Sequence, residues 1–266
     1  MRVSTAVWRS VHAEAVRSGG PSRLWTVVVP AAVAVPLAVT FGIAAVAEAF
    51  ARIPGQISVL AVTTSNAAYW VITITLTLVA VAGADGQAAE SRYRTADFVR
   101  LAVGRPVAVL IGRWLFYAGL GALLTAVTLV VALVGLPAVA PTVYGPVSLA
   151  DPVGIRLAWT LPVLAAFAAG AGVGVGALTR APLPAVGGIL LWSFVFETAA
   201  GYLPSGATLQ RFLPMFNVVY AAGQETVLTP PWSRDAALLY SCAVFTAIFT
   251  IAALDRAARE RTARND

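Results

Sequence analysis

The sequence predicts an all-α polytopic membrane protein with six transmembrane helices, an N-terminal interfacial helix, and short re-entrant or external helices between the fifth and sixth spans. The 266 residues are 59% hydrophobic and only 11% charged, with a mean hydropathy of +0.82. A soluble domain needs a more polar surface than this composition allows. Several apolar runs are long enough to cross about 30 Å of hydrocarbon, and the arginines gather at their ends. We therefore expect a single transmembrane domain over residues 1–266.

The N-terminal residues 1–23 are expected to form an interfacial helix. At 3.6 residues per turn, Val7 and Trp8 fall on one side of this helix, and Arg9 and Arg17 fall on the other. Such helices lie flat at the membrane surface, with tryptophan at headgroup depth and arginines near the phosphates. A cleaved signal peptide is the alternative, but the following apolar run is longer than the about 7 to 15 residues of a signal sequence.

Six apolar segments then alternate with polar or proline-rich ones. The expected spans are 24–50, 59–81, 114–134, 155–178, 185–200 and 236–254. A charged segment at 82–113 and a proline-broken loop around 136–154 separate the spans in the first half. The segment 201–235 is too polar and too rich in proline to cross, so we expect it to be re-entrant or external. Residues 255–266 form a polar tail.

The placement of the arginines predicts how the spans are oriented. Six spans put both termini on the same side of the membrane. All arginines except Arg52, Arg156, Arg211 and Arg234 lie on that side or in loops that share it. The positive-inside rule assigns this side to the cytoplasm. We therefore expect a multi-pass protein with both termini cytoplasmic.

The second expected span is more polar than a lipid-facing helix. In one continuous helix, Asn66, Thr73 and Thr77 share a face, at spacings of seven and four residues. In a bilayer such a face points toward other helices or a wet cavity. Hydrogen bonding between helices and direct contact with a substrate both fit this pattern. The candidates for lining a pathway, taken from spans two and five, are Asn66, Tyr69, Thr73, Thr77, Trp192, Phe196 and Glu197.

Glu197 is the most unusual acid, because it closes the fifth span. A carboxylate inside a membrane is commonly a proton or cation site. However, Gly201 and Pro204 follow closely, which places Glu197 near the outer interface. A structural or gating role is therefore favoured over proton coupling.

The fourth span contains glycine at alternate positions. Gly170, Gly172, Gly174 and Gly176 could be mistaken for a dinucleotide-binding fingerprint, but that motif needs a strand-turn-helix context and a later acid, which are absent. The pairs Gly170/Gly174 and Gly172/Gly176 instead have the small-x-x-x-small spacing of closely packed membrane helices. We expect these glycines to serve helix packing.

The sequence has no lysine and only one histidine and one cysteine, which excludes several classes of site. No lysine is present, so this chain cannot hydrolyse ATP through a Walker A loop. His12 is the only histidine and Cys242 the only cysteine, which leaves no basis for a catalytic triad, a metal-ligand cluster or an intrachain disulfide. The net charge of +6 comes from arginines at span ends, so nucleic acid is not an expected partner. We expect no enzyme activity and no metal.

The charged segment contains a local motif that reads Glu90-Ser91-Arg92-Tyr93-Arg94-Thr95, then Leu101, Gly104-Arg105-Pro106 and Gly112-Arg113. Together with the expected topology, this motif resembles the permease subunits of ATP-binding-cassette transporters of the type-2 exporter family. That family has a glutamate, a threonine, a leucine-rich turn, a proline and a Gly-Lys pair in the corresponding stretch. Here Arg113 replaces the lysine, Arg94 replaces the glycine before threonine, and the proline is displaced.

The resemblance implies that residues 87–98 form a coupling helix that docks in a cleft of a separate nucleotide-binding ATPase subunit, and that Met1–Ser18 is the elbow helix. Two permease subunits, identical or related, would pair with two ATPases around a pathway lined by spans two and five. The partner ATPase would bind ATP and Mg, and this chain would bind no cofactor. The partner-binding residues would be Gln87, Glu90, Arg92, Tyr93, Arg94, Thr95, Asp97 and Phe98.

The function implied by the resemblance is export of an amphiphilic or hydrophobic substrate, such as a drug, lipid or glycolipid, across the plasma (inner) membrane of a bacterium. Two alternatives stand beside it. The charged segment could be a solvated positive-inside loop, in which case the chain would be a membrane scaffold or accessory subunit that transports nothing. An ion-coupled secondary carrier would be expected to bury more ionisable groups at mid-bilayer than this sequence contains.

Overall fold

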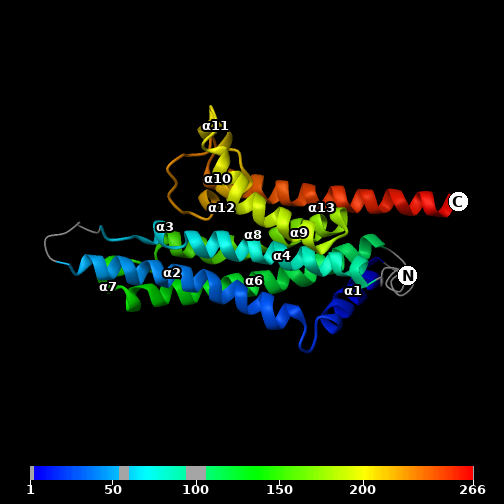
Figure 1. The fold of residues 1–266 in the computed structure, drawn as a ribbon, viewed down its shortest axis with the longest axis horizontal. Helices are drawn as coiled ribbons and strands as arrows, with labels where there is room; N and C mark the ends of the chain where they lie inside the picture. Colours follow the sequence, from blue (N-terminus) through cyan, green and yellow to red (C-terminus); the bar gives the residue numbers. More distant parts are fainter. Residues whose placement is uncertain (1–2, 54–59, 94–105, 266) are drawn as a thin grey trace.

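The computed structural model describes residues 3–53, 60–93 and 106–265. Over these residues the chain folds into helices, and six of its helical segments are long and apolar enough to span a membrane. The six segments run along one long axis, with both ends of the chain at the same end of the bundle (Figure 1). We call this the terminal end. The opposite end, which holds α3 and α7, is called the loop end.

The helices follow one another without any strand in the described ranges. The first half contains α1 (Val3–Arg17), the π-helical turn η1 (Leu24–Val28), α2 (Val29–Ala51), α3 (Thr64–Ala67), α4 (Tyr69–Tyr93), α6 (Pro106–Val139) and α7 (Pro141–Tyr144). The second half contains α8 (Pro152–Thr179), α9 (Pro182–Leu191), the π-helical turn η2 (Trp192–Phe196), α10 (Glu197–Ala200), α11 (Gly206–Gln210), α12 (Pro214–Ala221) and α13 (Arg234–Asn265). The membrane-length segments are η1–α2, α4, α6, α8, α9–η2–α10 and α13.

Proline and polar caps define where several helices begin and end. Helices α6, α7, α8, α9 and α12 each begin at proline, whose fixed φ and missing N–H suit the first helical position. At α8, the side chain of Asp151 also accepts a hydrogen bond from the backbone N–H of Val153 at 2.7 Å. The same helix ends at Arg180, whose left-handed φ of 57° reverses the chain toward α9.

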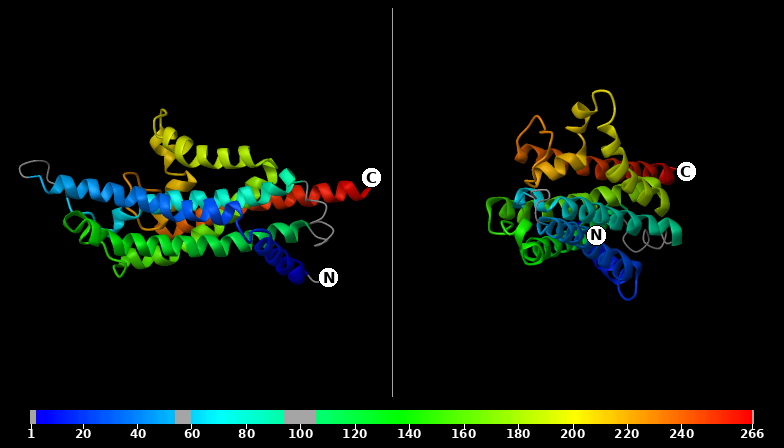
Figure 2. Two further views of the ribbon diagram at one scale, coloured as in Figure 1. Left: turned by 60° about the horizontal axis from the view of Figure 1, so that its bottom comes forward. Right: turned by 60° about the vertical axis from the view of Figure 1, so that its left-hand side comes forward.

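Helices α4 and α8 form the centre of the bundle. Helices α2 and α6 pack on one side of this pair, and α9 and α13 pack on the other (Figures 1 and 2). In the most apolar stretch of each segment, 78% of the α4 residues are buried, compared with 17% for α9–η2–α10. The fifth span therefore has the most unoccupied surface, and the second span has the least.

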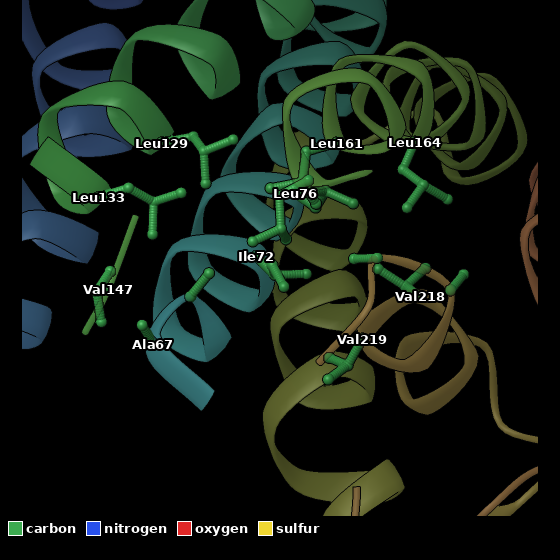
Figure 3. Packing of buried hydrophobic residues seen from close by; sticks show 14 of the residues in the cluster. Ala67, Ile72, Leu76, Leu129, Leu133, Val147, Leu161, Leu164, Val218 and Val219 are labelled. Carbon is green, nitrogen blue, oxygen red and sulfur yellow. The ribbon is translucent and has the colours of Figure 1, made fainter. Parts of the chain in front are cut away.

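Aliphatic side chains from four helices fill the core toward the loop end. Ile72 and Leu76 of α4 meet Leu129 and Leu133 of α6, Leu161 and Leu164 of α8, and Val218 and Val219 of α12 (Figure 3). Each of these side chains is at least nine-tenths buried. The short helix α12 is thus anchored in the bundle by its own apolar face.

The alternating glycines of α8 lie at close helix contacts. A Cβ on Gly172 or Gly176 would overlap the backbone of α4. Gly170 lies against the indole of α6, and Gly174 lies against the backbone of α13. Because adjacent members of this series face different helices, the absence of side chains lets α8 approach three neighbours at once.

The helices extend beyond the apolar runs from which the spans were predicted. The second helix continues to Tyr93, the third begins at Pro106 rather than at residue 114, and the last continues through the tail to Asn265. Much of the charged segment 82–113 and of the tail 255–266 is therefore helical. Hydropathy marks the part of a helix that lies in hydrocarbon, whereas the backbone hydrogen bonds continue into the polar region.

Two further expectations at the loop end need correction. Asn66 lies in α3 and not in the same helix as Thr73 and Thr77, because the chain leaves helical geometry at Ala68, with φ −106° and ψ 5°. The expected shared polar face therefore does not include Asn66. In addition, α6 continues through Pro137 to Val139, because a proline in the last turn removes only one backbone hydrogen bond.

Candidate functional site

A buried cluster of charged side chains joins four helices at the terminal end. Its centre is Arg113 of α6, whose side chain is 3% exposed. Its Nε donates to Glu14 Oε2 at 3.0 Å, one terminal nitrogen donates to Gln87 Oε1 at 2.8 Å, and the other pairs with Glu90 Oε1 at 2.8 Å. The guanidinium thus links α6 to both α1 and α4. We call Glu14, Arg17, Gln87, Glu90, Arg113, Tyr117 and Arg256 the charge cluster.

The outer members of the charge cluster complete the bonding of its two acids. Glu14 also accepts from the hydroxyl of Tyr117 at 2.9 Å and forms an ion pair with Arg17. Glu90 accepts from Arg256 of α13 at 2.8 Å, and Gln87 donates to the same oxygen at 3.1 Å. Three arginines therefore surround two carboxylates, and the residues come from α1, α4, α6 and α13.

Close backbone contacts make room for the charge cluster. A Cβ on Gly86 would overlap the hydroxyl of Tyr117, so this glycine lets the phenol reach Glu14. Gly112 plays the same part between α6 and α1, because a Cβ there would overlap Ser10. The hydroxyl of Ser10 donates to the carbonyl of Val109 at 3.1 Å. Helix α1 is therefore fixed to α6 at two neighbouring points.

The electrostatic balance of the charge cluster keeps Glu14 ionised. Burial raises the pKa of Glu14, but Arg113 and Arg17 lower it by more, so the pKa lies below the usual value of a glutamate. A buried carboxylate with this many donors is stable only while its arginine partners stay in place. The charge cluster therefore depends on the relative positions of α1, α4 and α6.

The predicted partner-binding residues divide between the charge cluster and the part of the chain that is not described. Gln87 and Glu90 each have 3% exposure and bind other residues of this chain. Their hydrogen-bonding groups face Arg113, Arg256 and each other, and contact of these two residues with a partner stays a prediction. Arg92 and Tyr93 belong to the last turn of α4. Arg94, Thr95, Asp97 and Phe98 lie outside the described residues, and their role stays a prediction.

An apolar cavity lies nearer the middle of the bundle. Its volume is about 370 Å³, and residues of α4, α8, α9, η2, α12 and α13 line it. Leu76, Ala171, Ile189 and Phe245 are typical of its wall. The hydroxyl of Thr77, which also lines it, already donates to the carbonyl of Thr73 at 2.7 Å. The cavity suits an apolar group.

A polar cavity adjoins the apolar one on the side of the loop end. Its volume is about 570 Å³, and it is lined by Tyr69 and Thr73 of α4, Gln210 of α11, and the segment 225–228. Ser193, Glu197 and Met215 line both cavities. The two cavities therefore share a wall and present an apolar and a polar half side by side.

Glu197 stands at the junction of the two cavities. The π-helical turn η2 brings its side chain under Trp192, whose Nε1 donates to Glu197 Oε1 at 2.7 Å. In a regular α-helix residues five apart do not face each other, so the wider turn is what allows this bond. The backbone N–H groups of Met215 and Phe216 donate at 3.0 and 3.2 Å. Glu197 thus fixes the start of α12 to the fifth span.

Most of the predicted pathway residues gather around these cavities. Tyr69 and Thr73 line the polar cavity, Thr77 and Trp192 line the apolar one, and Glu197 lines both. Phe196 lines neither cavity and is 57% exposed on the surface of the fifth span, so its place in a pathway stays a prediction.

Asn66 reaches the polar cavity indirectly. Its Nδ2 donates to Glu225 Oε2 at 2.9 Å, and Ser65 Oγ donates to Glu225 Oε1 at 2.9 Å. These hydrogen bonds, that of Asn66 first, lower the pKa of Glu225 below its usual value. Glu225, which lines the polar cavity, is therefore a carboxylate at neutral pH.

Sequence reasoning missed Glu14, Arg256 and Glu225. Glu14 had one signal, since it is the first acid of the chain and stands three residues before Arg17 on an otherwise basic segment. Arg256 and Glu225 had none, because their partners lie 166 and about 160 residues away in the sequence. Among the described residues, no group of histidine, cysteine and acidic side chains could hold a metal ion.

Comparison with known proteins adds no relative. No protein-family model, curated protein or solved structure matches the chain. Its function is therefore argued from the charge cluster, the cavities and the membrane-length helices.

Proposed function

We propose that this chain is the permease subunit of an ATP-binding-cassette exporter of the type-2 family, driven by a separate ATPase subunit that binds ATP and Mg. The proposal is supported by the six apolar helices, the N-terminal helix α1, and the sequence motif that runs from the end of α4 into the start of α6. The paired cavities favour an amphiphilic or hydrophobic substrate over a small ion, because much of their wall is apolar.

The continuity of α4 is the observation that carries the proposal. This one helix holds Tyr69 and Thr73 at the polar cavity and Gln87 and Glu90 in the charge cluster. Its 25 residues span about 37 Å. A force applied between α4 and α6 would thus reach the cavity through a single rigid element. The buried charge cluster would keep α1, α4, α6 and α13 moving together.

Further parts of the proposal concern membrane and assembly. The arginine distribution supports cytoplasmic termini, and the family resemblance implies the plasma (inner) membrane of a bacterium. The poorly covered fifth span supports pairing with a second permease subunit, identical or related, since 17% burial in its most apolar stretch leaves most of its surface for lipid or protein.

The test is ATP-driven transport by the chain together with its ATPase. We expect the affinity-tagged chain, isolated from its native membrane, to retain an ATPase and to drive ATP-dependent substrate uptake into inverted vesicles. Charge reversal at Arg94 and Asp97 should abolish uptake while leaving the chain inserted. Glu90 is left unchanged, because its replacement would disturb the charge cluster.

Arg211→Glu is the control, since Arg211 is an exposed residue on the external segment. It should leave uptake unchanged. Full ATP-dependent uptake by the Arg94 and Asp97 double variant would refute coupling through this segment. An ATPase that is retained but drives no uptake of any amphiphile would instead favour the scaffold or accessory-subunit function.

A further inference from the structure

The two adjoining cavities have complementary chemistry. The apolar cavity has a volume of about 370 Å³ and the polar cavity about 570 Å³. Both fall in the range of about 300 to 1,000 Å³ that is typical of small-molecule sites. Because Ser193, Glu197 and Met215 line both, one molecule with an apolar body and a polar group can occupy them together.

The charge of the polar cavity is negative. Glu197 and Glu225 are the acidic residues among those that line it, and no arginine is among them. Both carboxylates accept hydrogen bonds from neutral donors only: Ser65 and Asn66 for Glu225, and an indole and two backbone N–H groups for Glu197. Within the described ranges neither acid forms a salt bridge, so no contacting arginine neutralises the cavity.

Arg234 does not neutralise Glu225 by direct contact. Its charge acts on Glu225, but its guanidinium lies over the ring of Tyr220, 5.9 Å from the centroid, and Arg234 is not part of the cavity wall. Aromatic rings do contribute to the wall. Tyr69 and Phe216 line the polar cavity, and rings of this kind attract cations across their faces.

We propose that the two cavities form one binding site for a drug-sized cationic amphiphile. Its amine or quaternary ammonium group lies in the polar cavity with Glu197 and Glu225, and its apolar body lies in the apolar cavity. As an identification of the transported substrate class, this inference rests on the proposed exporter function. As a binding site in this chain, it stands on the cavities alone.

Size favours a drug-sized compound over a two-chain lipid. The apolar cavity lies near the lower end of the volumes found for small-molecule sites. A membrane lipid would have to place two acyl chains there. The negative polar cavity also disfavours lipids with anionic headgroups, because like charges repel.

The site can be tested with two fluorescent probes of matched shape and opposite charge. The purified chain, in micelles of a neutral maltoside detergent, is titrated with the trimethylammonium derivative of diphenylhexatriene and with its propionic acid analogue. Binding is read as saturable quenching of tryptophan fluorescence, after subtraction of empty micelles. We expect the cationic probe to bind at least about tenfold more tightly than the anionic one.

Charge variants test the polar half. Glu225→Gln should weaken the cationic probe about tenfold and leave the anionic probe no weaker. Glu260→Gln makes the same chemical change at the far end of α13 and should alter neither probe. Equal affinity of the wild-type chain for the two probes, or no effect of Glu225→Gln, would overturn the proposal.

Cavity-filling variants test the apolar half. Gly188 lines the apolar cavity, and a Cβ there would meet nothing within 4 Å, so Gly188→Leu should fill the cavity and weaken the cationic probe about tenfold. Gly187→Leu is the matched control, since Gly187 is equally open but does not line the cavity. Equal effects of the two leucines would refute the assignment of the apolar half.

The probe-binding assay also tests whether a membrane lipid occupies the site. Displacement of the cationic probe by phosphatidylethanolamine at equal concentration would show that a membrane lipid occupies the site and would overturn the assignment to a drug-sized compound. No ATPase is present in the binding assay. Failure to bind would therefore leave the coupling test of the exporter unaffected, and failure of coupling would leave a binding result standing.

Discussion

At the scale of single residues, Arg113 shows how a buried charge can be made compatible with a membrane protein. Each of its three side-chain nitrogens has a different partner, on α1 for one and on α4 for the other two. A guanidinium presents its donors in a fixed planar arrangement, which an ammonium group cannot reproduce. Position 113, where the permease family that the motif resembles has lysine, is therefore suited here to arginine in particular.

We expect Arg113→Ala to lower the free energy of unfolding by about 3 to 5 kcal/mol, because Glu14 and Glu90 would remain buried without their shared partner. Arg113→Lys should lower the free energy of unfolding by less, since it keeps the positive charge and loses only the planar arrangement of donors. The measurement is unfolding of the purified chain by sodium dodecyl sulfate in mixed micelles.

Arg259→Ala provides the comparison for that experiment. Its side chain is 57% exposed and pairs with Asp255 one turn away, so its loss should change stability by at most about 1 kcal/mol. Similar unfolding curves for Arg113→Ala and Arg259→Ala would show that the charge cluster does not hold the helices together.

The residues of the candidate site were predictable only in part. Polar side chains inside apolar runs, such as Thr73, Thr77 and Glu197, are visible in the sequence because they break the expected pattern. The pairing of Glu14 with Arg113, 99 residues apart, depends on which helices pack together. Glu225 gave no signal at all, because an acid in a polar loop is ordinary until the fold brings it to a cavity.

At the scale of helices, α8 depends on glycines at which any side chain would collide with a neighbour. A Cβ on Gly172 would overlap the carbonyl of Ala80 in α4, whereas one on Gly187 in α9 would meet nothing. Both positions lie within helices, so alanine has the same favourable effect on helix propensity at each. The difference between the two substitutions therefore isolates packing.

Gly172→Ala should lower the free energy of unfolding by about 1 to 3 kcal/mol, because α4 and α8 would have to move apart. Gly187→Ala should raise it by up to about 1 kcal/mol. Both are measured by the same detergent-induced unfolding. A neutral or stabilising effect of Gly172→Ala would show that the helix pair can separate without loss, contrary to the close contact described.

Hydropathy located all six membrane-length helices, because burial in hydrocarbon requires long apolar runs. It did not locate their ends. The polar turns of α4 that carry Gln87 and Glu90 are helical because the charge cluster satisfies them, and α13 carries Arg256 into the same cluster. Nor could hydropathy separate α3 from α4, since the break at Ala68 involves a residue with no helix-breaking character.

At the scale of the whole molecule, the terminal and loop ends differ in charge and in structure. The terminal end holds α1, the charge cluster and the end of α13, which extends past the other helices (Figures 1 and 2). The loop end holds the short helices α3 and α7, and α11 stands to one side of the bundle between the two ends. If the positive-inside rule holds, the terminal end lies in the cytoplasm.

This orientation can be measured by labelling single cysteines in a variant that carries Cys242→Ala. Tyr202→Cys, at a side chain that is 88% exposed, should react with a membrane-impermeant maleimide in intact cells. Arg261→Cys, near the end of α13, should react only after the cells are permeabilised. The opposite pattern would place the charge cluster outside the cell and would refute the proposed docking of a cytoplasmic ATPase.

The contact between Arg256 and Glu90 can form only after the last helix has been made. These residues are 166 positions apart, so the ribosome releases the second span long before it makes the last one. During that interval Glu90 can pair with Arg113, but it lacks the second arginine that it contacts in the finished fold. A product that stops short of residue 256 cannot make this contact, so its second and last membrane-length helices would not be joined through Glu90.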